Sequence, residues 1–235
     1  MRYTIVGDGK VSNHFCQYFS LLGIDYNRWS RKQSSRTLKS TTNNSNIVLL
    51  LISDNAIGQF VKDNPFLLNK QLMHFSGTMY FEHIIGCHPL MTFARDCYDL
   101  ETYQSIPFVC DKGVKFDKFF PQLNNRSFNI DPKDKAYYHA MCVMAGNFTQ
   151  TLMRETSQQM SQGLQLPSDI LFPYLLQNTK NFIQNPQESA TGPIQRGDFT
   201  TVRKHLQALQ SNSLEDIYHS FLKQSQKLMR VENEY

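Results

Sequence analysis

The sequence has few charged residues and no long apolar segment. Only 19% of its 235 residues are Asp, Glu, Lys or Arg, and the formal net charge is +4. No extended block of like charges occurs, which argues against a nucleic-acid-binding surface and favours small anionic ligands. The longest aliphatic run, Ile47 to Ile52, is far shorter than the roughly 20 residues of a membrane-spanning helix. We therefore expect no nucleic acid and no membrane as partners.

Cysteines are few and show no pairing or metal-binding pattern. There are five, an odd number, without a C-x-x-C pair, so we expect reduced thiols and no metal. Cys87 precedes His88, but sequence neighbours on a strand point to opposite faces, which argues against a Cys–His nucleophile. A strand-like segment starts at residue 2 and leaves no room for a secretory leader. These features predict a cytoplasmic protein.

Short apolar segments alternate with helical patterns in the first half of the chain. Strands alternating with helices predict an α/β domain built on a doubly wound parallel sheet. The predicted strands are residues 2–6, 24–29, 47–52, 71–75, 84–87 and 127–130. Beyond residue 130 only helical patterns remain. They cover residues 134–160, 171–182, 200–210 and 214–229. We therefore predict an α/β domain at 1–130 and an all-α domain at 131–235.

A glycine-rich turn follows the first predicted strand. Residues 7–12 read G-D-G-K-V-S and lead into a helical pattern at residues 10–22. In dinucleotide-binding folds the first glycine permits the sharp turn, the second admits the pyrophosphate, and the helix N-terminus attracts its charge. Gly7, Gly9, Lys10 and Val11 are therefore predicted cofactor contacts, although Ser12 replaces the third glycine. The alternative is a strand-to-helix turn without a ligand.

The second predicted strand ends without the carboxylate that holds a ribose 2′-hydroxyl in NAD-binding folds. Ser30, Arg31 and Lys32 stand there instead. A hydroxyl and two cations suit a 2′-phosphate, and Arg31 offers a planar fork for paired hydrogen bonds. We therefore predict NADP(H) as the cofactor. An exposed basic turn is the alternative.

Polar residues also follow the next predicted strands. Ser53 and Asn55 come after the third, Ser76 after the fourth, and His88 after the fifth. Ligands of doubly wound folds bind at the carboxyl ends of strands. We therefore predict cofactor contacts at Ser53, Asn55 and Ser76 and a substrate contact at His88. Turn or helix-capping roles are equally compatible with these positions.

Lys135 and His139 lie one turn apart at the start of the longest helical pattern. A lysine that faces a cofactor cleft can give a proton to a carbonyl oxygen as hydride arrives, and a histidine beside it can orient the substrate. Spacing alone favours the alternative, a solvated first turn with a buried structural histidine. The opposite face of the helix carries an apolar stripe of Tyr137, Met141, Met144, Phe148 and Leu152.

A glycine-proline loop at residues 191–198 interrupts the later helical patterns. Within it, Thr191 and Arg196 are predicted substrate contacts, with Arg196 suited to clamp a carboxylate. Asp198 precedes the next helical pattern and is the predicted N-cap of that helix.

Six segments together resemble a family of Rossmann-like oxidoreductases whose C-terminal helical domain was long listed as a domain of unknown function. They occur in the same order and spacing and extend over nearly the whole chain. The segments are GDGKVSNHF, SDNAI, HFSG, GCHPLMTF, DKAYYHAMCVMAGNF and TGPIQRGDFTTVRKHL. The family is similar to ketopantoate reductases, pyrroline-carboxylate reductases, hydroxyisobutyrate dehydrogenases and deazaflavin-dependent NADP reductases.

The resemblance implies NADPH-dependent reduction of a small 2-oxo acid, with 2-dehydropantoate in pantothenate synthesis as the first candidate. Lys135 matches a lysine that contacts the substrate carbonyl in the better-known relatives, and His139 stands where they have asparagine. The resemblance also implies a homodimer formed through the helical domain. Two alternatives stay open: reduction of another carbonyl or a cyclic imine, and a nucleotide-binding sensor or assembly protein without turnover.

Overall fold

The computed structural model describes residues 1–232, without the side chains of residues 35–36 and 226–232. The chain forms two compact units, which divide between Met153 and Arg154. This division lies inside helix α7 (Thr149–Leu164), whereas the predicted boundary lies at the end of strand β7 (Ser127–Ile130). The first unit thus includes the start of the long helical region.

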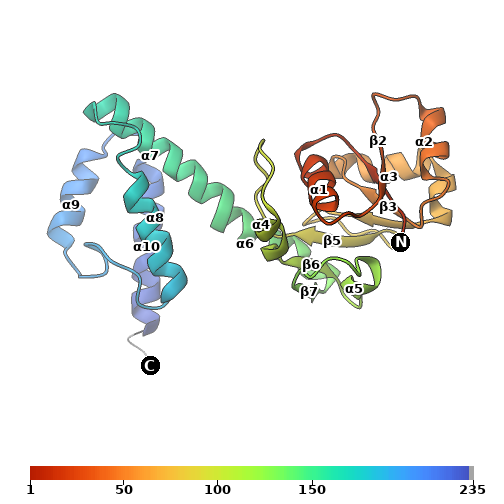
Figure 1. Cartoon of the computed structure of the whole chain (residues 1–235). Helices are drawn as coiled ribbons and strands as arrows, with labels where there is room; N and C mark the ends of the chain where they lie inside the picture. Colours follow the sequence, from red (N-terminus) through yellow and green to blue (C-terminus); the bar gives the residue numbers. More distant parts are fainter. Residues whose placement is uncertain (233–235) are drawn as a thin grey trace. The chain divides into compact units, whose positions relative to one another are not determined.

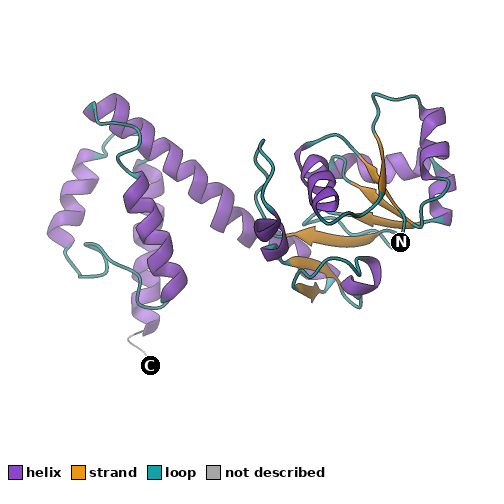
Figure 2. Ribbon diagram, viewed as in Figure 1, coloured by secondary structure: helices purple, strands orange, loops and turns teal. Residues whose placement is uncertain are grey.

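The first unit is built on one seven-stranded sheet, drawn in orange in Figure 2. Its spatial order is β2-β1-β3-β4-β5-β6-β7. Strands β1 to β5 run parallel, β6 pairs antiparallel with β5, and β7 runs parallel to β6. The predicted doubly wound parallel sheet is confirmed, with an antiparallel extension that the sequence did not indicate. The other strands are β1 (Tyr3–Val6), β2 (Tyr26–Trp29), β3 (Ile47–Leu50), β4 (Gln71–His74), β5 (Ile85–Pro89) and β6 (Phe108–Asp111).

Helices connect most of the strands, and the second unit consists of helices joined by loops (Figure 1). The predicted long helix at 134–160 is interrupted by one π-helical segment. In the first unit the helices are α1 (Lys10–Leu21), α2 (Ser35–Thr42), α3 (Asp54–Asp63), η1 (Pro65–Asn69), α4 (Leu100–Ser105), α5 (Phe116–Phe119), η2 (Pro132–Asp134), α6 (Lys135–Cys142) and the π segment η3 (Val143–Phe148). After α7, the second unit contains α8 (Phe172–Gln184), α9 (Phe199–Ala208) and α10 (Glu215–Glu232).

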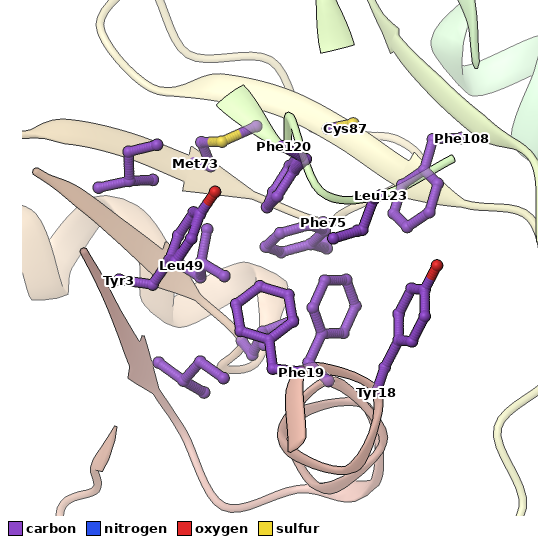
Figure 3. Packing of buried hydrophobic residues seen from close by; sticks show 14 of the residues in the cluster. Tyr3, Tyr18, Phe19, Leu49, Met73, Phe75, Cys87, Phe108, Phe120 and Leu123 are labelled. Carbon is purple, nitrogen blue, oxygen red and sulfur yellow. The ribbon is translucent and has the colours of Figure 1, made fainter. Parts of the chain in front are cut away.

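The alternation of side chains along the strands gives the sheet two apolar faces. Tyr3 and Leu49 face one cluster, which contains Phe19 of α1, whereas Val6 and Leu50 face another, which contains residues of α2 and α3. In Figure 3, Phe19 of α1 points up toward the strand side chains Tyr3 and Leu49, and Tyr18 points up on the side of Leu123 and Phe108. Both faces are therefore covered, as expected for a parallel sheet.

Strand β1 lies between β2 and β3, so the connections leave it in opposite directions. In open α/β sheets this reversal opens a crevice at the carboxyl ends of the strands. The glycine turn after β1 lies at this point, which places it where a ligand is expected.

The second unit buries few apolar side chains. Among its residues of described burial, Val202 is the only one that is buried. Asp198 caps α9 as predicted, because its carboxylate accepts a hydrogen bond from the Thr201 backbone N–H at 3.0 Å. Across residues 1–232, none of the helices combines the length and the apolar character needed to cross a membrane.

Candidate active site

A cavity of ≈ 700 Å³ lies at the carboxyl ends of the parallel strands. Most of the predicted cofactor residues line it, together with the predicted substrate contact His88. Lys32, Asn55, Lys135 and His139 are not among the lining residues. The predicted residues that line it are Gly7, Gly9, Lys10, Val11, Ser30, Arg31, Ser53, Ser76 and His88.

The glycine turn has the geometry that the sequence predicts. Gly7 has a φ of +139°, and a Cβ there would lie 2.1 Å from the carbonyl oxygen of Leu51, so only glycine fits. A Cβ at Gly9 would meet no atom within 4 Å. Gly9 precedes α1 without a side-chain cap, which leaves the first N–H groups of the helix available to an anion.

Ser12 has a structural reason to replace the third glycine. Its side chain is fully buried, and its hydroxyl donates a hydrogen bond to the Gly7 carbonyl oxygen at 2.8 Å. Arg28 also binds this carbonyl, with its Nε at 3.1 Å. The side chains of Ser12 and Arg28 thus both bind the Gly7 carbonyl oxygen and fix the turn, which compensates for the missing glycine.

The end of β2 carries a cluster of cations beside the cavity. Arg31 lines the cavity itself. Lys32 forms an exposed ion pair with Asp8 at 2.9 Å, and its hydrogen bond holds the pKa of Asp8 below the usual value. Lys32 and Arg28 line a second, more open cavity of ≈ 520 Å³, which also includes Ser30. Arg28 was not among the predicted site residues, because it lies within β2 and not after it.

A carboxylate and a hydroxyl meet at the ends of β3 and β4. Asp54 and Ser76 both line the cavity, and the Ser76 hydroxyl donates a short hydrogen bond to the Asp54 carboxylate. The same hydroxyl accepts the backbone N–H of Met79 at 3.1 Å. Asp54 was not among the predicted site residues, although it directly follows Ser53 at a strand end.

His88, at the end of β5, pairs with a tyrosine of α6. Its Nδ1 lies 2.8 Å from the hydroxyl of Tyr138, and its ring contacts that of His139 with centroids 5.6 Å apart. Burial, followed by the charges of His139 and Lys135, lowers the pKa of His88 to about 4. Burial also raises the pKa of Tyr138. At neutral pH both groups are therefore uncharged.

Lys135 lies outside the cavity lining, in a buried ion pair. Its side chain pairs with Asp111 of β6 at 2.7 Å, and the residue is only 2% exposed. The second carboxylate oxygen of Asp111 accepts the backbone N–H of Gly86 at 2.7 Å. A Cβ at Gly86 would lie 2.6 Å from the Lys135 ammonium nitrogen, so glycine makes room for the pair. Lys135 was predicted as a catalytic residue that faces a cofactor cleft; its ammonium lies against Asp111 of β6, and its role in catalysis stays a prediction.

The same region buries a second uncharged histidine, His74 of β4. Its Nδ1 accepts the backbone N–H of Ser76 at 3.3 Å. Its Nε2 has no hydrogen-bond partner among residues 1–232. Burial and the nearby charge of Lys135 lower its pKa to about 4.

The remaining predicted site residues lie elsewhere. His139 packs against Gly77, where a Cβ would come within 2.2 Å of its imidazole ring. Asn55 is exposed on α3. Thr191 and Arg196 lie in the loop before α9 in the second unit, and their contact with a substrate stays a prediction.

The surroundings of Cys87 bear on the Cys–His nucleophile that the sequence analysis weighed. Cys87 is fully buried, and its pKa is raised well above the usual value by burial and by the adjacent Cys110, which disfavours the reactive thiolate. Within the described part of the chain, no three His, Cys, Asp or Glu side chains are placed to hold a metal ion.

Residues 114–225 match a protein family described as Domain of unknown function (DUF2520). This match supports the resemblance over that part of the chain, whereas the relation to ketopantoate reductases stays a prediction. No curated protein matches the chain.

Several solved structures share the fold. The chain is similar to a candidate NADP oxidoreductase from Bacteroides fragilis, with 18% identity, a TM-score of 0.75, and coverage of 96% of this chain and 98% of that one. It is also similar to pyrroline carboxylate reductase from Plasmodium falciparum with NADP bound, with 14% identity, a TM-score of 0.59 and 96% coverage of both chains. A third is reductive aminase from Aspergillus terreus in complex with NADPH and ethyl levulinate, with 12% identity, a TM-score of 0.62, and coverage of 97% of this chain and 93% of that one. The Rossmann-like fold with a helical C-terminal part is thereby confirmed.

Proposed function

We propose that the chain is an NADPH-dependent reductase of a small carbonyl or imine compound. The observation that carries the proposal is the cavity along the carboxyl ends of β1 to β5, which joins a phosphate-binding turn to a group of polar side chains. From β2 to β5 the sheet order gives four strand steps, or roughly 19 Å, a length suited to an extended dinucleotide.

The residues present fit the cofactor. The open space at Gly9 and the uncapped N-terminus of α1 suit the pyrophosphate. Ser30 and Arg31 line the cavity at the end of β2, and with the neighbouring Lys32 they suit a 2′-phosphate. Ser53 and Ser76, at the other side of β1, suit the nicotinamide half. Bound NADPH would supply the hydride, and the structures with NADP or NADPH that share this fold support the assignment.

Two classes of substrate fit the proposed function: 2-oxo acids, and other carbonyl compounds or imines. The resemblance favours a 2-oxo acid, with 2-dehydropantoate as its first candidate, and the proposed contacts for it are Thr191 and Arg196. The similar folds of a pyrroline carboxylate reductase and a reductive aminase support another carbonyl or an imine. A nucleotide-binding sensor without turnover would also need the cofactor-binding turn.

A binding titration and a turnover screen separate these functions. We expect NADPH to bind in a fluorescence titration, and we expect a panel of 2-oxo acids, ketones, aldehydes and cyclic imines to contain a compound that consumes it. Binding without any turnover would overturn the reductase proposal in favour of the sensor. Growth of a pantothenate auxotroph that expresses the chain tests 2-dehydropantoate specifically.

We also propose that the protein is a homodimer joined through the helical unit. Val202 is the only buried apolar residue among those described from Arg154 onward. Large apolar side chains of the unit are instead exposed, and a face of this kind is stabilised by covering it. The exposed residues on α8 are Phe172, Tyr174, Leu176, Phe182 and Ile183.

A further inference from the structure

The titratable side chains that line the cavity fall into two groups along the sheet. Asp8, Lys10 and Arg31 belong to the turn after β1 and to the end of β2, where the phosphates are proposed to bind. Asp54 follows β3, and His88 belongs to β5. Since β2 and β5 lie on opposite sides of β1 and β3, His88 is the group farthest along the row of strands from Arg31.

The other polar groups on this side are engaged with one another. The Ser76 hydroxyl donates to Asp54. The Lys135 ammonium is buried against Asp111. His74 also has a nitrogen without a partner among the described residues, but this residue does not line the cavity. On this side, His88 is therefore the lining residue with a titratable nitrogen available to a molecule in the cavity.

Only one nitrogen of His88 is available, because the other is paired. Nδ1 lies 2.8 Å from the Tyr138 hydroxyl, and no described residue forms a hydrogen bond with Nε2. The lowered pKa of His88 and the raised pKa of Tyr138 keep both groups uncharged. A phenol that donates to Nδ1 fixes the tautomer that carries its proton on Nε2.

We propose that Nε2–H of His88 is the donor to the reacting oxygen or nitrogen of the substrate, that Tyr138 is the positioning residue that sets its tautomer, and that the substrate is therefore a carbonyl compound or a neutral imine and not an iminium ion. This inference rests on the proposed reductase function. It assigns proton donation to His88, which lines the cavity, and not to Lys135, which does not.

The reaction balances with NADPH, which is oxidised to NADP⁺, as the source of the hydride and with water as the final source of the proton. A C–H bond forms between the incoming hydride and the carbonyl carbon as the C–O π bond breaks, and the electron pair of that bond moves to oxygen. The oxygen takes the Nε2 proton of His88, Nδ1 takes the hydroxyl proton of Tyr138, and water returns a proton to Tyr138. A neutral imidazole N–H stabilises the developing negative charge on oxygen without first carrying a charge itself.

The same donor does not suit an iminium ion. The nitrogen of an iminium ion has no lone pair to accept a hydrogen bond, and it loses positive charge as hydride adds. The donor therefore separates substrates that take a proton, namely carbonyl compounds and neutral imines, from iminium ions. A cyclic N-methyl iminium salt is the matched probe, because it resembles a cyclic imine but cannot accept a proton.

The first test compares His88 variants on the carbonyl compound or neutral imine that the screen identifies. We expect His88→Ala to lower kcat by roughly 10²–10⁴-fold, with the Kd for NADPH unchanged. His88→Gln, which keeps a side-chain N–H, should retain more of the rate. His83→Gln is the matched control, because His83 is exposed and outside the cavity lining. Unchanged Kd values also show that the variants are folded.

The second test addresses Tyr138 through the tautomer of His88. The ¹⁵N NMR signals of His88 should show a protonated Nε2 in the wild type and lose this preference in Tyr138→Phe. We expect kcat of Tyr138→Phe to fall on the order of tenfold or more, as when a partner that orients a histidine is lost, while the KM for NADPH stays unchanged. A wild type with its proton on Nδ1 would overturn the assignment.

The outcomes separate this inference from the proposed function. Reduction of carbonyl compounds or neutral imines that depends on His88 supports both. Reduction of the N-methyl iminium salt in place of these compounds, or their reduction at the wild-type rate by His88→Ala, overturns the inference and leaves the reductase function standing. Failure to reduce any class despite NADPH binding overturns the reductase function, and the inference with it.

Discussion

At the scale of single residues, Lys135 contributes to stability and has a predicted role in catalysis. A single and a double variant separate the two. Its ion pair with Asp111 is buried, so Lys135→Met leaves an uncompensated carboxylate, and we expect the free energy of unfolding to fall by about 3–5 kcal/mol. Adding Asp111→Asn removes that charge, keeps an acceptor for the Gly86 N–H, and should restore most of the stability. Chemical denaturation measures both effects.

The same double variant tests the predicted catalytic role of Lys135. If the charge of Lys135 supports the reaction, turnover of the double variant should stay reduced by roughly 10²–10⁴-fold although its stability returns. Wild-type turnover in the stable double variant would show that Lys135 serves the fold alone. Binding of NADPH is the control for an intact cofactor site.

His74 links stability to pH. Its pKa of about 4 in the folded protein lies below its ordinary value of 6.5, so the unfolded chain binds a proton between these values that the folded chain does not. Stability should therefore be fully present above pH 6.5 and should fall as the pH drops toward 4, by up to about 3 kcal/mol for this residue.

The measurement is the free energy of unfolding at several pH values for the wild type and for His74→Phe. The variant should show a shallower dependence between pH 4 and 6.5 and keep the contribution of His88, which has a similarly lowered pKa. Identical slopes for the two proteins would contradict the assignment.

At the scale of the elements, strands β1 to β5 were predictable because each combines apolar residues with a nearby turn or helix signal. Strand β6 (Phe108–Asp111) was not predicted, although α4 precedes it and α5 follows it. It pairs antiparallel with β5, an arrangement that the pattern of a parallel sheet does not indicate. Without β6 there was no reason to pair Asp111 with Lys135. The buried ion pair of Lys135 was therefore not predicted.

The end of β2 carries the clearest prediction for the cofactor. Loss of the guanidinium in Arg31→Ala removes a charge-assisted pair with a 2′-phosphate, which costs on the order of 1.5–3 kcal/mol, or roughly tenfold or more in Kd. We expect weaker binding of NADPH and unchanged binding of NADH in fluorescence titrations. Lys39→Ala is the matched control, because Lys39 is an exposed cation of α2 outside the cavity lining. Equal losses for both cofactors would contradict 2′-phosphate recognition.

At the scale of the whole molecule, the sequence located the strand ends but not the contacts made across them. His88 and Tyr138 are 50 positions apart and belong to β5 and α6. Spacing rules compare residues within one element, so they found Lys135 and His139 as neighbours and had no means to find this pair. The cofactor side depends on one local turn and was predictable, whereas the proposed substrate side is assembled by tertiary packing.

The apolar surface of the helical unit gives the last prediction. On α8, Phe172, Leu176 and Ile183 are exposed and fall within one narrow stripe at 100° per residue. A stripe of this kind, on a unit with so little buried apolar surface, should be covered by a second copy of the chain. We expect light scattering at micromolar concentration to give a mass near twice 27.3 kDa. Ile183→Glu should shift the protein toward the monomer, while Asn178→Glu, on another side of α8, should not. A wild-type monomer would contradict the proposed dimer.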